Sequence, residues 1–151
     1  MDTPIKYLFD KDRIIDAINK LFISTDSRDW NNVKKCFADK VHFDMTSLGG
    51  SDPVRLTPDE IVDMWDKGLK PLEAVHHQAG NYKVDIKNNK AIAFCYGIAF
   101  HYKQTKSGKN SRTFVGSYNF HLIKKDNNWL IDSFKFNLKF LDGNPELGKD
   151  I

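Results

Sequence analysis

Hydrophobic residues recur every three to four positions between residues 12 and 30. This spacing predicts an amphipathic helix with one buried stripe. The stripe that runs through Ile18 and Phe22 next reaches Asp26, where a carboxylate replaces carbon. An ionised carboxylate that turns inward there needs a partner. On the pattern alone we would instead expect the helix to end near Thr25 and Asp26 to turn outward into a local turn bond.

Two further helices and a strand are predicted before the middle of the chain. Asp29 is a suitable cap for a short helix over residues 30–38, and a strand is expected at 41–46. The third helix is predicted over residues 58–69, because Pro58 would fall in its first turn, where a missing N–H costs little.

The second half of the chain has the character of strands separated by turns. Long apolar runs alternate with polar clusters such as "KNNK", "KSGKN" and "DNN". This order predicts an antiparallel meander. With helices first and the sheet afterwards, the expected fold is a single α+β domain over residues 1–151. The runs cover residues 76–86, 91–104, 112–125 and 129–141.

Side chains alternate between the two faces of a strand, and two of these runs have unequal faces. From Ala91 onward the odd positions are small and end in His101, whereas the even positions are bulky. In the next run, Ser117 and Asn119 share one parity. If the paired residue numbers sum to an even number, Asn119 and His101 share a face, and the small polar side chains there leave room for a cavity.

The bulky positions predict an apolar sheet face that three helices are too few to cover. We therefore expect a partner subunit on it, in a homodimer or homotrimer. The bulky residues assigned to this face are Phe94, Tyr96, Phe100, Phe114, Tyr118 and Phe120.

Composition narrows the class of protein further. The 151 residues include 23 basic and 20 acidic ones, for a formal charge of +3, without the dense basic stripe of a nucleic-acid binder. No run approaches the roughly 20 apolar residues that cross a bilayer, and the start lacks a signal-peptide pattern. Cys36 and Cys95 are not at metal or redox spacing. We expect a cytoplasmic protein that binds neither nucleic acid nor membrane and keeps both thiols reduced.

Local motifs in four places resemble one known family. "STDSRDW" is similar to the segment that carries the family's catalytic aspartate, here Asp26. "HHQAGN" and "AFHYKQ" resemble the segments of its two catalytic histidines, here His77 and His101. "SYNFHLIKK" resembles the strand whose serine and asparagine bind the ligand, here Ser117 and Asn119. Together they resemble scytalone dehydratase and related proteins in the SnoaL-like branch of the nuclear transport factor 2-like superfamily.

The resemblance implies a cone-shaped fold in which the N-terminal helices pack inside a strongly curved, mostly antiparallel sheet. It also implies that Asp26 turns inward, toward His101 in preference to His77. Thr25 and Met45 stand where the dehydratase has two tyrosines that activate the substrate carbonyl, so carbonyl activation must differ here. Trp65 is expected on the pocket wall.

The implied activity is that of a cofactor-free lyase, a dehydratase acting on a small cyclic hydroxy-carbonyl compound. His77 would take the α-proton, and His101 would assist the departing oxygen. Asp26 and both histidines could instead form a metal-binding triad. The family's chemistry runs without metal, so neither metal nor cofactor is expected. An isomerase or cyclase, a non-catalytic carrier of a small apolar ligand, and an interaction domain stay open as alternatives.

Overall fold

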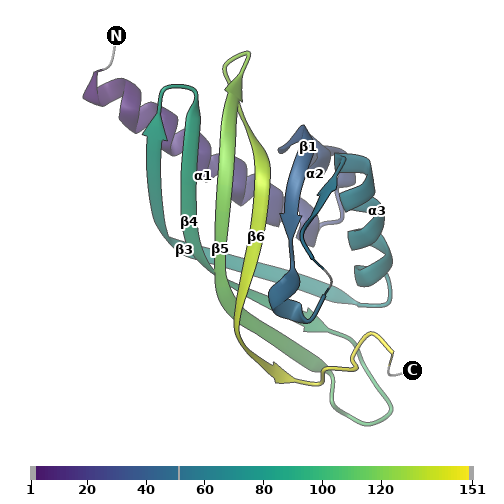
Figure 1. Cartoon of the computed structure of the whole chain (residues 1–151). Coiled ribbons are helices and arrows are strands. Elements are labelled where there is room, and N and C mark those ends of the chain that lie inside the picture. Colours follow the sequence, from purple (N-terminus) through teal and green to yellow (C-terminus); the bar gives the residue numbers. More distant parts are fainter. Residues whose placement is uncertain (1–2, 51, 150–151) are drawn as a thin grey trace.

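Residues 3–50 and 52–149 are described by a computed structural model of the chain. Six strands form one sheet in the order β2-β1-β6-β5-β4-β3, in which β1 and β6 are parallel and the other neighbours are antiparallel (Figure 1). The predicted α+β class is therefore confirmed. In chain order the elements are α1 (Pro4–Asp26), α2 (Trp30–Lys34), β1 (Phe37–Asp44), a short 3₁₀ helix η1 (Thr46–Leu48), β2 (Val54–Leu56), α3 (Pro58–Leu69), β3 (Ala74–Lys87), β4 (Lys90–Tyr102), β5 (Ser111–Lys125) and β6 (Asn128–Gly143).

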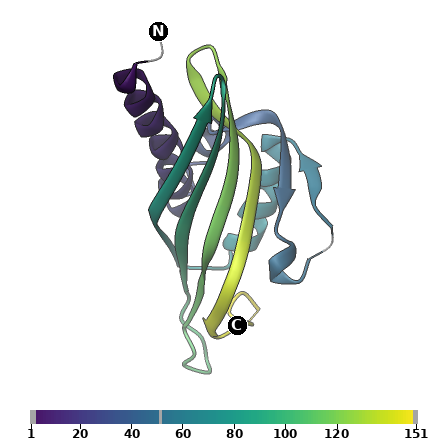
Figure 2. The same ribbon diagram turned by 60° about the vertical axis from the view of Figure 1, so that its left-hand side comes forward.

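The helices gather on one side of this sheet. In Figure 1 α1 runs behind the long strands and α3 lies beside the β1 end of the sheet, and the long strands bend along their length (Figures 1 and 2). Within the part of the chain that the structure describes, no helix covers the opposite side. We call the side that faces the helices the inner face and the other side the outer face.

Helix α1 begins earlier than its apolar pattern predicts. Thr3 caps it by accepting the N–H of Lys6. Asp10 is only 3% exposed and accepts hydrogen bonds from Trp129 Nε1 at 3.1 Å and Lys124 Nζ at 3.0 Å. This buried polar contact ties the first turns of α1 to β5 and β6.

The other early elements follow the prediction in part. Helix α3 has the predicted bounds and begins with a capping box between Thr57 and Glu60. Asp29 caps α2 as expected, but α2 ends at Lys34, and β1 begins already at Phe37. Strand β2 was not predicted, since three residues are too few for a periodic signal.

The register between β4 and β5 corrects the predicted faces. His101 pairs with Arg112 and Tyr96 pairs with Ser117, so the paired numbers sum to an odd value. Ser117 and Asn119 therefore lie on the outer face, opposite to His101, and the prediction that they share a face is wrong.

Packing explains this register. On the inner face, Tyr118 and Phe120 of β5 pair with the small residues Cys95 and Ala93 of β4. On the outer face the bulky residues belong to β4. Each face thus receives large side chains from one strand and small ones from the other, whereas the predicted register would place large against large. The predicted bulky face is accordingly divided: Phe94, Tyr96 and Phe100 are outer, and Phe114, Tyr118 and Phe120 are inner.

Candidate active site

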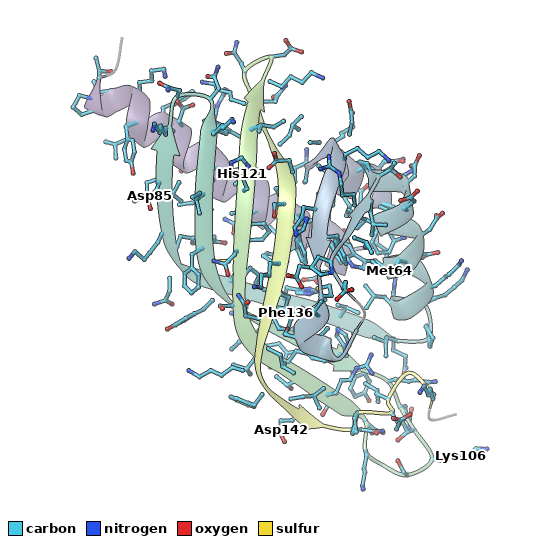
Figure 3. All side chains as sticks on the ribbon, in the orientation of Figure 1. Met64, Asp85, Lys106, His121, Phe136 and Asp142 are labelled. Carbon is cyan, nitrogen blue, oxygen red and sulfur yellow. The ribbon has the colours of Figure 1, made fainter. Side chains whose placement is uncertain are left out.

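A cavity of about 250 Å³ lies between the inner face of the sheet and helices α1 and α3. Figure 3 marks two residues on its walls, Met64 on α3 and Phe136 on β6. The walls are mostly carbon, with a few polar side chains among them, which is typical of a site for a small organic molecule. The complete lining is Phe22, Thr25, Met45, Leu48, Met64, Trp65, Gly68, Leu69, His77, Ala99, His101, Arg112, Phe114, Tyr118, Phe134 and Phe136.

Asp26 is the last residue of α1, and both of its carboxylate oxygens bond to one residue of β3. Oδ2 accepts the backbone N–H of His77 at 2.8 Å, and Oδ1 lies 2.5 Å from Nδ1 of the His77 ring. Because an ionised carboxylate only accepts, Nδ1 carries the proton and Nε2 keeps its lone pair. The ring of Phe22 stacks on this imidazole at 5.2 Å between centroids.

Two expectations about Asp26 are thereby corrected. It does not turn outward into a local turn, because its carboxylate crosses to β3. It also bonds to His77 rather than to His101, whose Nδ1 accepts from Arg112 instead.

Arg28 fixes the turn that carries Asp26 out of α1. Its backbone is left-handed, with φ of 56°, and its Nη2 donates to the carbonyls of Leu69 at 3.1 Å and Leu72 at 2.7 Å. Its Nε is buried and has no hydrogen-bond partner among the described residues. The end of α1 is therefore fastened to the segment after α3, beside the cavity.

His101 has a different partner, on β5. Arg112 Nε donates to His101 Nδ1 at 3.1 Å. Since a guanidinium only donates, Nδ1 must hold the lone pair, and the neutral ring carries its proton on Nε2. Burial lowers the pKa of His101 to about 3, assisted by the charges of Arg112 and His77 and opposed by Asp26. His101 is thus a neutral hydrogen-bond donor rather than an imidazolium.

Tyr118 is a further polar group on the wall. It is 5% exposed, and its hydroxyl has no hydrogen-bond partner within the described residues. Burial raises the pKa of this phenol, and the nearby ionisable groups of Cys95 and Asp26 raise it further by smaller amounts, so it stays protonated and able to donate. Its ring lies directly over Gly97, where a Cβ would come 2.2 Å from the ring carbon Cε2.

The remaining candidates separate by face. Thr25, Met45 and Trp65 line the cavity, although Thr25 Oγ1 is occupied in donating to Leu21 O at 2.7 Å. Ser117 and Asn119 do not line it. Their side chains accept from Asn137 Nδ2 on the outer face, at 3.2 and 2.7 Å.

Arg112 and Tyr118 are the functional candidates that the sequence reasoning missed. Both have even numbers on β5, and the assumed register placed that parity on the outer face. Had the large residues of one strand been matched to the small residues of the next, both would have been assigned to the cavity.

Among residues 3–50 and 52–149 no three His, Cys, Asp or Glu side chains are grouped as a metal site. Cys36 and Cys95 are both buried, and burial raises the pKa of the first to about 11 and of the second to about 12. Neither is a reactive thiolate near neutral pH. No described helix is both long and apolar enough to span a membrane.

Comparison with known proteins identifies the family and the fold. Residues 6–135 match the family described as SnoaL-like domain. The Kfla4162 protein from Kribbella flavida has a similar structure, with a TM-score of 0.89, 18% identity, and coverage of 95% of this chain and 99% of that one. No protein with a curated description matches the sequence.

Two further similar structures carry the names of enzymes. A hexachlorocyclohexane dehydrochlorinase, LinA type 2, has a TM-score of 0.80 at 14% identity, covering 94% of this chain and 93% of that one. A protein from Novosphingobium aromaticivorans, provisionally named a scytalone dehydratase, has a TM-score of 0.83 at 11% identity, covering 94% and 92%. At such identities the likeness shows the nuclear transport factor 2-like fold alone.

Proposed function

Because this chain belongs to the SnoaL-like domain family, we propose that it is a cofactor-free lyase that removes water next to a carbonyl in a small cyclic compound. The observation that carries the proposal is the His77–Asp26 pair, which opens onto a mostly apolar cavity of about 250 Å³. Structurally similar proteins with lyase names support the reaction class.

The proton-transfer group in this proposal is His77. Asp26 holds Nδ1–H, so Nε2 is the free base, and the carboxylate stabilises the imidazolium that forms. Nε2 takes the proton from the carbon next to the carbonyl. The C–H and C–O bonds break, a C=C bond forms, and the imidazolium returns the proton to the departing hydroxyl, which leaves as water. A single residue on one side of the substrate implies loss from the same face.

The carbonyl oxygen gains negative charge as the proton leaves, and two donors on the wall suit it. His101 offers Nε2–H and Tyr118 offers its hydroxyl. Both are neutral donors in a mostly apolar site, where such hydrogen bonds stabilise a developing oxyanion strongly. They take the place of the phenols that Thr25 and Met45 lack. Arg112 acts through His101 and is a positioning residue for this step.

The test uses a panel of cyclic β-hydroxy ketones in D₂O. Dehydration gives a conjugated enone that absorbs in the ultraviolet, and proton abstraction alone gives deuterium at the α-carbon by NMR. We expect both signals with at least one compound. Exchange without enone would favour an isomerase or cyclase. Binding by thermal shift without exchange for every compound would leave a non-catalytic carrier as the function.

The outer face supports a homo-oligomer, either a dimer or a trimer. It exposes large apolar side chains, among them Tyr96 and Phe140, each 53% exposed, and Ile92, 59% exposed. An exposed apolar surface of this kind is typical of a subunit interface. Light scattering at micromolar concentration should give a multiple of the 17.4 kDa chain mass, and a monomeric mass would contradict this assignment.

A further inference from the structure

Arg112 brings a fixed positive charge to the wall of the cavity. It lies on the inner face of β5, paired in register with His101. Nε donates to His101 Nδ1 at 3.1 Å, and Nη1 donates to the carbonyl of Pro145 at 3.3 Å. Among the described residues Nη2 has no hydrogen-bond partner. One part of the guanidinium is therefore held by protein, while the other retains donors for a ligand.

The contacts around Arg112 hold this cation in place. Its guanidinium lies 5.4 Å from the centroid of the Phe114 ring. The C-terminal segment that supplies the Pro145 carbonyl is itself anchored, because Leu147 is fully buried and Asn144 N–H donates to Ser111 O at 2.8 Å. A positively charged group fixed before binding loses little entropy when a ligand arrives.

No acidic side chain balances this charge within the cavity. The lining residues include no Asp or Glu. Arg112 makes no ion pair with a carboxylate of the described residues. Burial lowers the pKa of Arg112, and the charge of Glu146 opposes this, although Glu146 is already paired with Lys149 at 3.3 Å. A half-buried cation without a close counter-ion is unfavourable, and a bound anion would relieve that cost.

We propose that Arg112 forms an anion subsite and that the substrate is a small, mostly apolar carboxylate. A single guanidinium with one unoccupied nitrogen matches a monoanion such as a carboxylate better than a dianionic phosphate. The remaining walls are carbon and accept a hydrocarbon ring. The assignment of this compound as a substrate rests on the proposed lyase function. The subsite itself does not need catalysis, since it is a matter of binding.

The experiment compares each probe carboxylate with its neutral amide. Cyclohexanecarboxylate and benzoate are titrated by calorimetry against cyclohexanecarboxamide and benzamide, which have nearly the same shape. We expect the wild-type protein to bind the carboxylates more tightly, by roughly tenfold to a hundredfold, as for hydrogen bonds to a charged group. Equal affinity for carboxylate and amide would overturn the proposal without any variant.

Variants then assign the preference to one residue. Arg112→Met should abolish the preference, so that each carboxylate binds no more tightly than its amide, and Arg112→Lys should keep part of the preference. Arg55→Met is the matched control, because Arg55 is an exposed arginine on β2 away from the cavity. If a folded Arg112→Met protein keeps the wild-type preference, the anion is held elsewhere and the proposal is wrong.

The two proposals fail in distinguishable ways. Asp26→Asn should lose the chemistry but keep carboxylate binding, because Asp26 does not contact Arg112 in the structure. Carboxylate binding without turnover of any hydroxy-carbonyl compound would contradict the lyase and leave the subsite. Turnover of neutral hydroxy ketones that a carboxylate group does not improve would contradict the subsite and leave the lyase.

Discussion

The two faces of the sheet each carry a histidine–aspartate pair, and the two pairs have nearly the same geometry. On the inner face Nδ1 of His77 lies 2.5 Å from Oδ1 of Asp26, and on the outer face Nδ1 of His121 lies 2.6 Å from Oδ1 of Asp132. Figure 3 places His121 on β5 in a view in which α1 lies behind the sheet. Their surroundings differ: the inner side chains are 14% and 18% exposed, the outer ones 36% and 28%.

A histidine–aspartate pair is therefore not sufficient to make an active site. The outer pair joins two neighbouring strands and is the more exposed of the two in the single chain, where water screens its charges. The inner pair joins the end of a helix to a strand, stacks against Phe22 and shares a cavity with His101 and Arg112. There the lone pair on Nε2 can meet a carbon acid inside a mostly apolar cavity. Variants of the outer pair therefore serve as controls for variants of the inner pair.

The largest effect on the rate of α-proton exchange is expected from substitutions that disrupt the inner pair. Asp26→Asn or His77→Gln should lower the rate of α-proton exchange roughly 10²–10⁴-fold, the usual contribution of a general acid–base group. The amide in Asp26→Asn cannot stabilise the imidazolium and can hold the ring in the wrong tautomer. Exchange into D₂O by NMR is the measurement, with circular dichroism to show that the fold is intact.

Asp132→Asn and His121→Gln are the matched controls and should keep wild-type exchange. If the inner and outer variants lose exchange rate equally, both pairs affect the rate by stabilising the fold. Near-normal exchange in both inner variants would show that the pair is structural.

The next largest effect concerns the pH dependence of stability, which should depend on His101 of the inner face. The folded pKa of His101 is about 3, below the ordinary value near 6.5, so between these pH values the unfolded chain binds a proton that the folded chain does not. Stability is therefore lost as pH falls from 6.5 toward 3. The loss reaches at most roughly 4–5 kcal/mol, at about 1.4 kcal/mol per pKa unit.

Urea unfolding of His101→Gln at pH 7 and at pH 4 tests this. The variant should lose less stability between the two pH values than the wild type. His42→Gln, at an exposed position on β1, should behave like the wild type. If His101→Gln is as acid-sensitive as the wild type, His101 is not held neutral.

The sequence names both residues of the inner pair as candidates but assigns Asp26 to the wrong histidine. Local motifs single out Asp26, His77 and His101, because each stands in a recognisable segment, and the structure pairs Asp26 with His77 rather than with His101. Their partners depend on how separate strands align. The connection between Tyr102 and Ser111, which pair with each other, admits either parity, and a shift of one residue exchanges every side chain between the faces. Arg112 and Tyr118 were therefore missed, and Ser117 and Asn119 were wrongly placed.

The start of α1 was missed for a different physical reason. A periodic pattern shows which positions bury carbon, but the buried residue in this stretch is Asp10, while Ile5, Leu8 and Phe9 are exposed by 78%, 63% and 55%. A buried carboxylate whose hydrogen-bond partners are distant in sequence leaves no apolar signal in the sequence.

A smaller effect is expected from Gly97, which supports the inner face beneath Tyr118. Gly97→Ala would place its Cβ 2.2 Å from a ring carbon, so the ring must move or the strands must separate. We expect a loss of about 1–3 kcal/mol in the free energy of unfolding, as for other overpacked cores. The measurement is urea unfolding, accompanied by calorimetric binding of benzamide as a probe of cavity shape.

Gly80→Ala is its control on β3, because nothing lies within 4 Å of the added carbon. It should change stability by less than about 1 kcal/mol. Equal losses in both variants would mean that strand flexibility, rather than the Tyr118 ring, requires glycine at these positions.

The smallest effect should come from the outer pair itself, where the comparison can be made quantitative. Because His121 and Asp132 are about a third exposed, their coupling should be roughly 0.2–1 kcal/mol, the range of surface ion pairs. A double-mutant cycle with His121→Ala, Asp132→Ala and the double variant measures this term at pH 6. The coupling should decrease as salt rises from 0.05 to about 1 M, because the Debye length then falls to roughly 3 Å.

The same cycle on His77 and Asp26 should respond less to salt, because those side chains are more enclosed. Equal salt dependence would mean that water reaches both pairs alike, and the exclusion of water on which the proposed chemistry of the inner face depends would be contradicted.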